Sequence, residues 1–126
     1  MTTITVMRLA SVVTAINVLI ATGFSVAAII NPQYLVPAAA PTEASLLLAM
    51  YAAAPRIPLA LLVLGAVYKQ AAPALLILGT LAGAMQVLDG GIGLFAHDAG
   101  KSAGPLFIAV LQFVVVYLLH KSVRIK

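Results

Sequence analysis

Two ionisable side chains, Arg56 and Asp89, interrupt long apolar segments of this chain and are suited to ligand binding or proton transfer. Arg56 stands near the middle of residues 45–67, and Asp89 lies within residues 73–95. An arginine at the centre of a membrane-spanning helix costs about 2.5–3.5 kcal/mol, so such a charge normally faces a partner or a cavity. A guanidinium and a carboxylate can form a bidentate, charge-assisted pair. We therefore expect Arg56 and Asp89 to meet inside the protein.

Three uncharged polar side chains extend this candidate ligand-binding site. Counted outward from the turn between the two segments, Arg56 is level with Gln86. Asp89 lies about one helical turn, or about 5 Å, beyond that level, which an arginine side chain can reach. Tyr51 is about one turn from Arg56 along the same segment, and its hydroxyl could join the site. Asn17 lies near the middle of residues 9–30 and is either a ligand contact or an inter-helical hydrogen bond, which stabilises by about 0.6–2 kcal/mol.

The prolines on both sides of Arg56 support a cavity at this depth. Pro55 and Pro58 have no backbone N–H. The carbonyls four residues earlier, at Tyr51 and Ala54, therefore lose their helical donors. Carbonyls freed at membrane depth must be satisfied by side chains, water or a ligand, and broken helices beside buried charges often line binding cavities. A purely structural ion pair that fixes the register of two helices is the alternative interpretation.

Four apolar segments approach or exceed the span of about 20 residues that a membrane-crossing helix requires. They cover residues 9–30, 45–67, 73–95 and 102–119, and the last is the shortest. The first is longer than the core of about 7–15 apolar residues in a signal peptide, so we expect it to be a retained helix. None alternates strictly between apolar and polar residues, which points to an all-α protein.

Short connections join these segments, so consecutive helices should be antiparallel neighbours. Residues 31–41 contain three prolines, which prevent a continuous helix there. Thr42 is expected to cap the second helix, with Glu43 favourably placed on its dipole. The predicted fold is an integral membrane, up-down four-helix bundle, and the whole chain, residues 1–126, is expected to form a single transmembrane domain.

Small and polar residues recur at helical spacing on one face of three of the segments. Such stripes are usually packing faces, because small side chains let helix backbones approach closely in a membrane. We therefore expect these faces to turn toward the interior of the bundle. Their members are Thr14, Asn17, Ala21, Ser25 and Ala28, then Gly79, Ala82, Gly83, Gln86, Asp89, Gly90 and Gly93, and finally Ala109, Gln112 and Val116.

The composition of the chain is that of a membrane protein. Of its 126 residues, 63% are hydrophobic and 8% are charged, whereas about a quarter are charged in soluble domains. Cysteine is absent, which excludes thiolate catalysis and disulfide exchange. The net charge of +4 arises at the ends of the segments and not from a basic patch with interleaved aromatic residues, so nucleic acid is not an expected partner.

Basic residues gather on one side of the predicted bundle. Cytoplasmic loops carry an excess of Lys and Arg, so we expect both termini in the cytoplasm and the protein in the plasma (inner) membrane. Lys101 falls on the other side, together with Glu43 and Asp98. The residues on the cytoplasmic side are Arg8, Lys69, Lys121, Arg124 and Lys126.

Other patterns do not amount to a catalytic or metal-binding site. His97 and Asp98 are two neighbouring ligand types without a third, and a metal site needs more. His120 stands at the end of a segment, where it suits the helix C-terminus. No Ser-His-Asp arrangement falls at membrane depth. We predict no catalytic residues, no metal ligands and no obligatory cofactor.

The two central segments resemble the DoxX-like families, which are small four-helix bacterial membrane proteins. The resemblance lies in residues 54–61, around Arg56, and in residues 81–90, a small-residue stripe that ends at Asp89. Many of these sequences follow the Arg with an acidic residue, but Ile57 stands here, so Asp89 becomes the expected partner. Some members resemble subunits of quinone-linked membrane oxidoreductases. The resemblance therefore implies a quinone as a candidate ligand and such subunits as candidate partners.

The function expected from these features is a non-enzymatic, accessory one in the lipid bilayer. The bundle is expected to bind a lipophilic small molecule, quinone- or lipid-like, at Arg56, Asp89 and Gln86, with Asn17 and Tyr51 as further contacts. One alternative is a structural subunit of a larger membrane complex. Another is a small proton-coupled transporter that protonates Asp89 and works as a homodimer. The last is a membrane enzyme with Asp89 as general acid or base beside Arg56.

Overall fold

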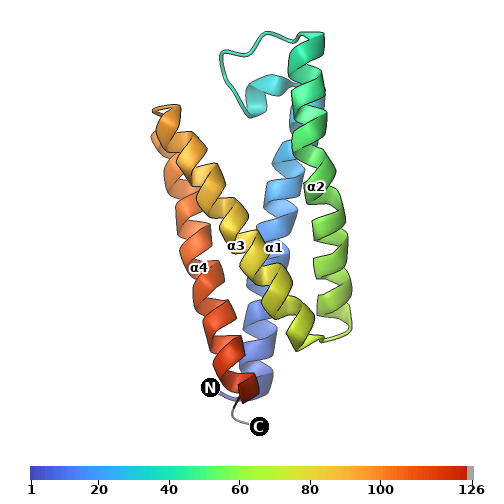
Figure 1. Cartoon of the computed structure of the whole chain (residues 1–126), viewed down its shortest axis with the longest axis vertical. Helices are drawn as coiled ribbons and strands as arrows, with labels where there is room; N and C mark the ends of the chain where they lie inside the picture. Colours follow the sequence, from blue (N-terminus) through green and yellow to red (C-terminus); the bar gives the residue numbers. More distant parts are fainter. Residues whose placement is uncertain (125–126) are drawn as a thin grey trace.

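The computed structural model of the chain describes residues 1–124, which are helical apart from short connections. Four long helices, α1 (Thr3–Ile30), α2 (Glu43–Tyr68), α3 (Ala72–Phe95) and α4 (Ala99–Arg124), run alternately up and down (Figure 1). A short 3-10 helix, η1 (Pro32–Tyr34), follows α1. Each long helix is long and apolar enough to cross a membrane. Within residues 1–124 the expected all-α bundle with four candidate spans is confirmed.

The four helices form two closely packed pairs. α1 packs on α2, α3 packs on α4, and α1 also contacts α4. α2 and α3 contact each other sparsely, although only a short turn connects them. Figure 1 shows the reason, because α3 leans away from α2 as it rises from their turn. We call this sparsely packed boundary between residues 43–68 and 72–95 the α2–α3 seam.

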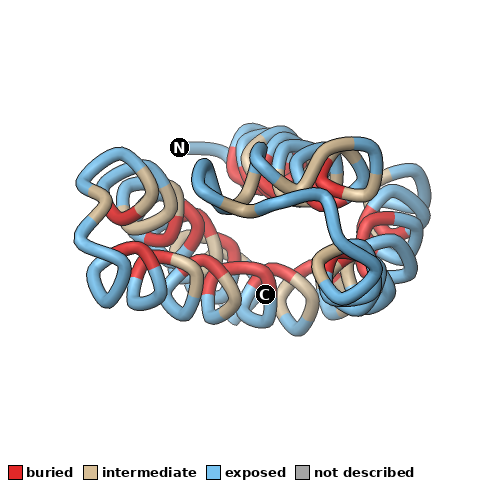
Figure 2. The backbone as a smooth tube through the Cα atoms, turned by 90° about the horizontal axis from the view of Figure 1, so that it is seen from above, coloured by how far each residue is buried: buried red, intermediate tan, exposed pale blue. Residues whose placement is uncertain are grey.

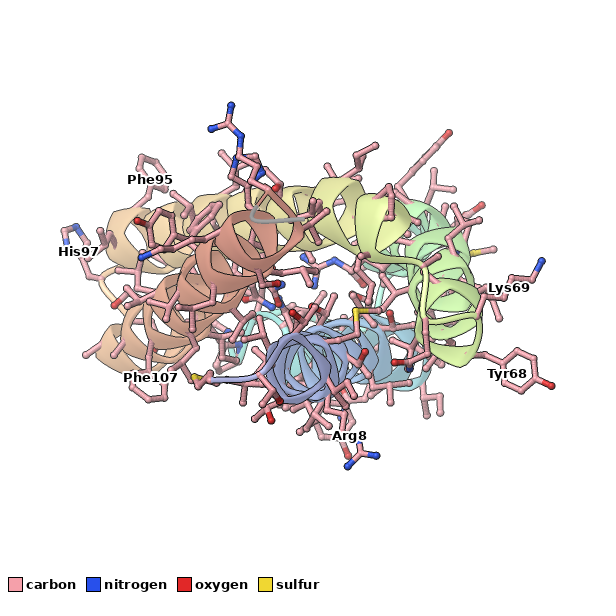
Figure 3. The ribbon with its side chains drawn as sticks, turned by 90° about the horizontal axis from the view of Figure 1, so that it is seen from below. Arg8, Tyr68, Lys69, Phe95, His97 and Phe107 are labelled. Atoms are coloured by element: carbon pink, nitrogen blue, oxygen red, sulfur yellow. The ribbon has the colours of Figure 1, made fainter. Side chains whose placement is uncertain are left out.

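Buried residues line the inner sides of the four helices, and exposed residues cover the outside (Figure 2). The large apolar side chains on the outside suit a lipid environment, since lipid-facing helix surfaces are apolar. Phe95 and Phe107 are examples that point away from the bundle in Figure 3. One core cluster, at mid-height, consists of Val18, Leu59, Ala60, Val63 and Ala82. A second includes Val6, Met7, Ala10, Ala66, Leu75, Val115 and Leu119.

Glycines on α3 allow the close approach of α4. A Cβ atom added to Gly93 would lie 2.4 Å from the carbonyl carbon of Lys101, and one added to Gly90 would lie 2.6 Å from Cγ of Leu106. Both distances are far shorter than a non-bonded contact allows. The stripe expected to form one face of the third helix therefore divides, because its glycines contact α4 whereas Asp89 turns toward α2.

α1, α2 and α4 begin before the apolar segments of the sequence, and a polar side chain caps the first turn of each. Thr2 caps α1 and Thr42 caps α2, the second as expected. Residues 99–101, which precede the expected segment 102–119, form the first turn of α4. The reason is Asp98, whose carboxylate accepts a hydrogen bond from the backbone N–H of Lys101 at 3.1 Å. Such a bond satisfies one of the free donors at a helix start.

The first residue and the end of α4 lie at the same end of the bundle as the turn between α2 and α3 (Figure 1). Arg8 and Lys69 lie near this end and point outward in Figure 3. Lys121 and Arg124, in the last turn of α4, add two more positive charges. Lys126, which the sequence places with them, lies outside the described residues. The connection from α1 to α2 lies at the opposite end, where the Lys101 ammonium donates a hydrogen bond to the carbonyl of Leu35.

Candidate functional site

A chain of buried amide side chains crosses the middle of the bundle. The Gln86 amide of α3 donates to Asn17 of α1 at 2.6 Å, and the Asn17 amide donates to Gln112 of α4 at 3.0 Å. The Gln112 amide then donates to the hydroxyl of Thr14 at 2.9 Å. All four side chains are buried. Because each buried amide finds a partner, this chain fixes α1, α3 and α4 at one relative height.

Arg56 and Asp89 form an ion pair beside this amide chain. Nη2 of Arg56 lies 2.6 Å from Oδ1 and 2.8 Å from Oδ2 of Asp89, which are distances of charge-assisted hydrogen bonds. The expected contact between the two residues is therefore present. Its geometry differs from the parallel two-nitrogen fork that was expected, since a single nitrogen serves both oxygens. The second terminal nitrogen, Nη1, is 3.3 Å from the carbonyl oxygen of Ala21 on α1.

The backbone around Arg56 is also held by α1. The hydroxyl of Thr22 donates to the carbonyl of Arg56 at 3.2 Å. With the contact from Nη1 to Ala21, this bond ties Arg56 firmly to the α1–α2 pair. Asp89 belongs to the α3–α4 pair, so the ion pair joins the two halves of the bundle across the α2–α3 seam.

The ion pair is half-buried and can be reached from outside the bundle. The side chain of Arg56 is 17% exposed, and the side chain of Asp89 is 25% exposed. Arg56 lies near the middle of α2, and Asp89 lies in the second half of α3. α2 and α3 contact each other sparsely along their lengths and diverge as they leave their turn (Figure 1). The ion pair is therefore accessible from the side of the bundle.

A small cavity separates the ion pair from the amide chain. Its volume is about 10 Å³, which is about the space that one water molecule requires. Four of the five residues predicted for the site meet around this cavity, namely Arg56, Asp89, Gln86 and Asn17. Its full lining is Asn17, Val18, Ala21, Thr22, Arg56, Leu59, Ala82, Met85, Gln86 and Asp89.

Tyr51 is the one predicted site residue that lies apart. Its side chain is 68% exposed, and it neither lines the cavity nor forms a hydrogen bond with Arg56. The reason is angular, since five residues along a helix rotate a side chain by about 140° away from the first. The structure therefore does not bring the Tyr51 hydroxyl to the site.

The Arg56 guanidinium keeps unused donor capacity. A guanidinium carries five N–H groups, and the contacts to Asp89 and Ala21 involve only its two terminal nitrogens. Within residues 1–124, Nε has no partner. The one enclosed side-chain polar atom without a partner in that range is the hydroxyl of Ser11, so Nε is not sealed from its surroundings. Arg56 can therefore donate a further hydrogen bond while it holds Asp89.

Thr22 and the carbonyl of Ala21 are contacts of Arg56 that the sequence did not reveal. Thr22 is the only hydroxyl residue on α1 between Thr14 and Ser25, but it is five residues from Asn17 and therefore about 140° away around the helix, so its spacing was no signal. A backbone carbonyl such as that of Ala21 gives no signal in a sequence, because every residue has one.

A larger groove lies elsewhere, at the end of the bundle that carries the first residue. Its volume is about 360 Å³, and none of its lining residues is charged. That volume falls within the range of about 300–1,000 Å³ found for small-molecule pockets. It therefore has to be distinguished from the ion pair in any binding experiment. Its lining is Thr3, Ile4, Met7, Gln70, Ala72, Leu119 and Val123.

The chemistry available at the ion pair is the recognition of a polar head by one guanidinium and one carboxylate. Within residues 1–124 no three His, Asp or Glu side chains gather in a way that could hold a metal ion. Comparisons of the chain with protein-family models, with curated proteins and with solved structures find no match.

Proposed function

We propose that this protein binds a lipophilic small molecule, quinone- or lipid-like, whose polar head is held by Arg56 and Asp89 in the α2–α3 seam. Gln86 and Asn17 stand behind the ion pair across the small cavity and support it. The role is an accessory one in the membrane and not catalysis by the chain itself. The DoxX-like resemblance belongs to the same proposal, as do a membrane oxidoreductase subunit or a second copy of the chain as partners.

The half-buried ion pair in the α2–α3 seam is the observation that carries this proposal. Ionisable residues inside membrane spans are costly and usually mark the path or the site of a ligand. A pair that only fixes the register of two helices needs no opening at the side of the bundle, whereas a pair that binds a ligand does. Here the pair lies where α2 and α3 contact each other sparsely, and both side chains remain partly exposed.

The size of the cavity indicates how a ligand would lie. Behind the ion pair there is room for about one water molecule, so a ring or head group does not fit there without helix movement. The polar head therefore lies at the exposed edge of the pair, and Nε of Arg56, which has no partner, is a donor that remains for it. The apolar tail follows the seam in the bilayer, beside the apolar outer surfaces of α2 and α3.

The orientation proposed for the protein has both termini in the cytoplasm, in the plasma (inner) membrane. Arg8, Lys69, Lys121 and Arg124 lie toward the end that carries the first residue. Lys101 lies at the opposite end with Glu43 and Asp98. Cytoplasmic ends of membrane proteins carry the excess of Lys and Arg, which favours this orientation.

Native mass spectrometry of the gently extracted protein, with identification of co-purified lipophiles, tests the proposal. A bound molecule should be present in the wild type and absent from Arg56→Ala. Arg8→Ala is the matched control, because it removes the same side chain from an exposed position outside the site. Ala72→Phe partly fills the larger groove and should leave the bound molecule in place. Circular dichroism of each variant confirms that the helices are intact.

Two outcomes would redirect the interpretation. An empty wild type together with an Arg56→Ala variant that unfolds would indicate that the pair is structural and that the chain is a subunit of a larger membrane complex. A bound molecule that is still present in Arg56→Ala but absent from Ala72→Phe would place the ligand in the larger groove. For the proton-coupled transporter, the bound molecule should exchange with pH in the wild type and not in Asp89→Asn.

A further inference from the structure

We infer that the site at Arg56 and Asp89 selects a lipophile with a neutral, hydrogen-bond-accepting head, such as a ketone or ester carbonyl, over one with an anionic head. Asp89 is the residue that sets this selectivity. The inference rests on the proposed function and narrows the class of ligand for the same site. It is carried by the charge balance of the pair and by the donors that Arg56 leaves free.

The ion pair presents almost no net charge to a ligand. Nη2 of Arg56 contacts both oxygens of Asp89, so the two opposite charges lie within one hydrogen-bond length of each other. The other formal charges of the described residues lie near or beyond the helix ends and not beside the pair. They are Arg8, Glu43, Lys69, Asp98, Lys101, Lys121 and Arg124.

A neutral carbonyl suits this balance. It can accept a hydrogen bond from the free Nε–H of Arg56 while Nη2 stays on Asp89 and Nη1 stays on Ala21. It gives up little hydration when it leaves the bilayer interface. No existing bond of the pair has to break, so the cost of binding is small.

An anionic head meets two obstacles at the same place. It would share a guanidinium that Asp89 already neutralises, and it would lie beside the Asp89 carboxylate. Moving an ion away from water is costly unless full charge compensation replaces its hydration. At an effective dielectric constant of about 20, removing a like charge about 6 Å away changes an affinity by about a hundredfold. Replacing Asp89 with a neutral residue should therefore raise the affinity for anions by about that factor.

Two probes with the same chain and different heads test this inference. Hexadecyl methyl ketone carries a neutral carbonyl, and hexadecyl sulfonate carries a permanent negative charge. Their binding to the full chain in detergent micelles is measured by native mass spectrometry over a concentration series. We expect the wild type to bind the ketone at least about tenfold more tightly, because the sulfonate's lost hydration is not replaced.

Variants then assign the preference to Asp89. Asp89→Asn should shift the sulfonate-to-ketone affinity ratio by about a hundredfold toward the sulfonate. Asp89→Glu keeps the negative charge and should therefore keep the preference for the ketone. Asp98→Asn removes the same charge at the far end of the bundle and should leave the ratio unchanged. Arg56→Met should lose both probes, since methionine has no group that can donate a hydrogen bond.

The wild type alone can overturn the inference, even if a variant fails to fold. Sulfonate bound by the wild type as tightly as the ketone or more tightly would contradict the selectivity, while the binding of a lipophile would still stand. Neither probe bound by a folded wild type would instead count against the proposed function itself. An unchanged affinity ratio in a folded Asp89→Asn would remove Asp89 from the role of selector.

Discussion

A double-mutant cycle on Arg56 and Asp89 separates the structural cost of the ion pair from its role in binding. The variants are Arg56→Met, Asp89→Leu and the double variant, in which apolar side chains replace both charges. Each single variant leaves one charge without its partner in a helix that is long and apolar enough to span a membrane. The double variant leaves no charge in the α2–α3 seam.

The expected magnitudes follow from this difference. Breaking a buried pair by removing one partner costs about 3–5 kcal/mol, and the partial exposure of this pair favours the lower end of that range. The double variant should lie within about 1 kcal/mol of the wild type, because apolar replacement of both partners removes the desolvation cost as well. With about 3 kcal/mol for each single variant, the interaction energy in the cycle is about 5 kcal/mol.

Reversible unfolding in mixed micelles of dodecyl maltoside and sodium dodecyl sulfate, followed by far-ultraviolet circular dichroism, measures these free energies. A double variant destabilised by the sum of the two single effects would refute the reasoning, since the two charges would then act independently. The same double variant should retain its fold and lose the bound lipophile. Retention of the lipophile would show that the pair does not hold the ligand head.

Three further perturbations test the helix packing, the amide chain and the turn between α2 and α3. Gly93→Ala should destabilise the protein by about 1–3 kcal/mol, because the new Cβ would overlap the backbone of Lys101. In the matched variant Gly91→Ala the new Cβ meets no atom within 4 Å, so this variant should be more stable by about 0.5–1 kcal/mol. The same mixed-micelle unfolding measures both. Gln112→Leu should cost about 1–3 kcal/mol, because the Asn17 amide loses its acceptor at 3.0 Å, and more rapid amide exchange in α4 would report the loosening. Gln70→Gly should raise the thermal midpoint, with a gain of about 0.5–1 kcal/mol, because residue 70 has a φ of 50° that glycine adopts without strain.

The position of each polar residue along the bundle axis could be predicted from the sequence, but the neighbouring helix that its side chain faces could not. Counting from the turn between α2 and α3 places Arg56 within reach of Asp89, and that contact is present. The count needs only the helix rise and a short turn, and both hold here. It gives no information on how far two helices diverge, so the sparse contact between α2 and α3 was not foreseen.

Which side of a helix faces the interior is harder to predict in a membrane protein than in a soluble one. Where lipid replaces water, apolar residues cover the outside as well as the core, so the amphipathic pattern that marks a buried face is weak. Small and polar residues are the remaining signal. In α3 they correctly mark the interior but do not reveal that Gly90 and Gly93 contact α4 while Asp89 contacts α2. Tyr51 was misplaced for the same reason, since a polar residue near the site in sequence can still face outward.

The position of the ion pair links ligand binding to the stability of the bundle. Arg56 is fixed to α1 by two hydrogen bonds, and Asp89 is carried by the α3–α4 pair, so the ion pair is a main polar connection across the seam. A lipophile that lies along the seam adds contacts where α2 and α3 supply few of their own. A molecule that binds the folded state alone, at a concentration of 100 times its dissociation constant, stabilises that state by about 2.7 kcal/mol. The bound molecule should therefore raise the unfolding free energy of the wild type and leave that of the apolar double variant unchanged.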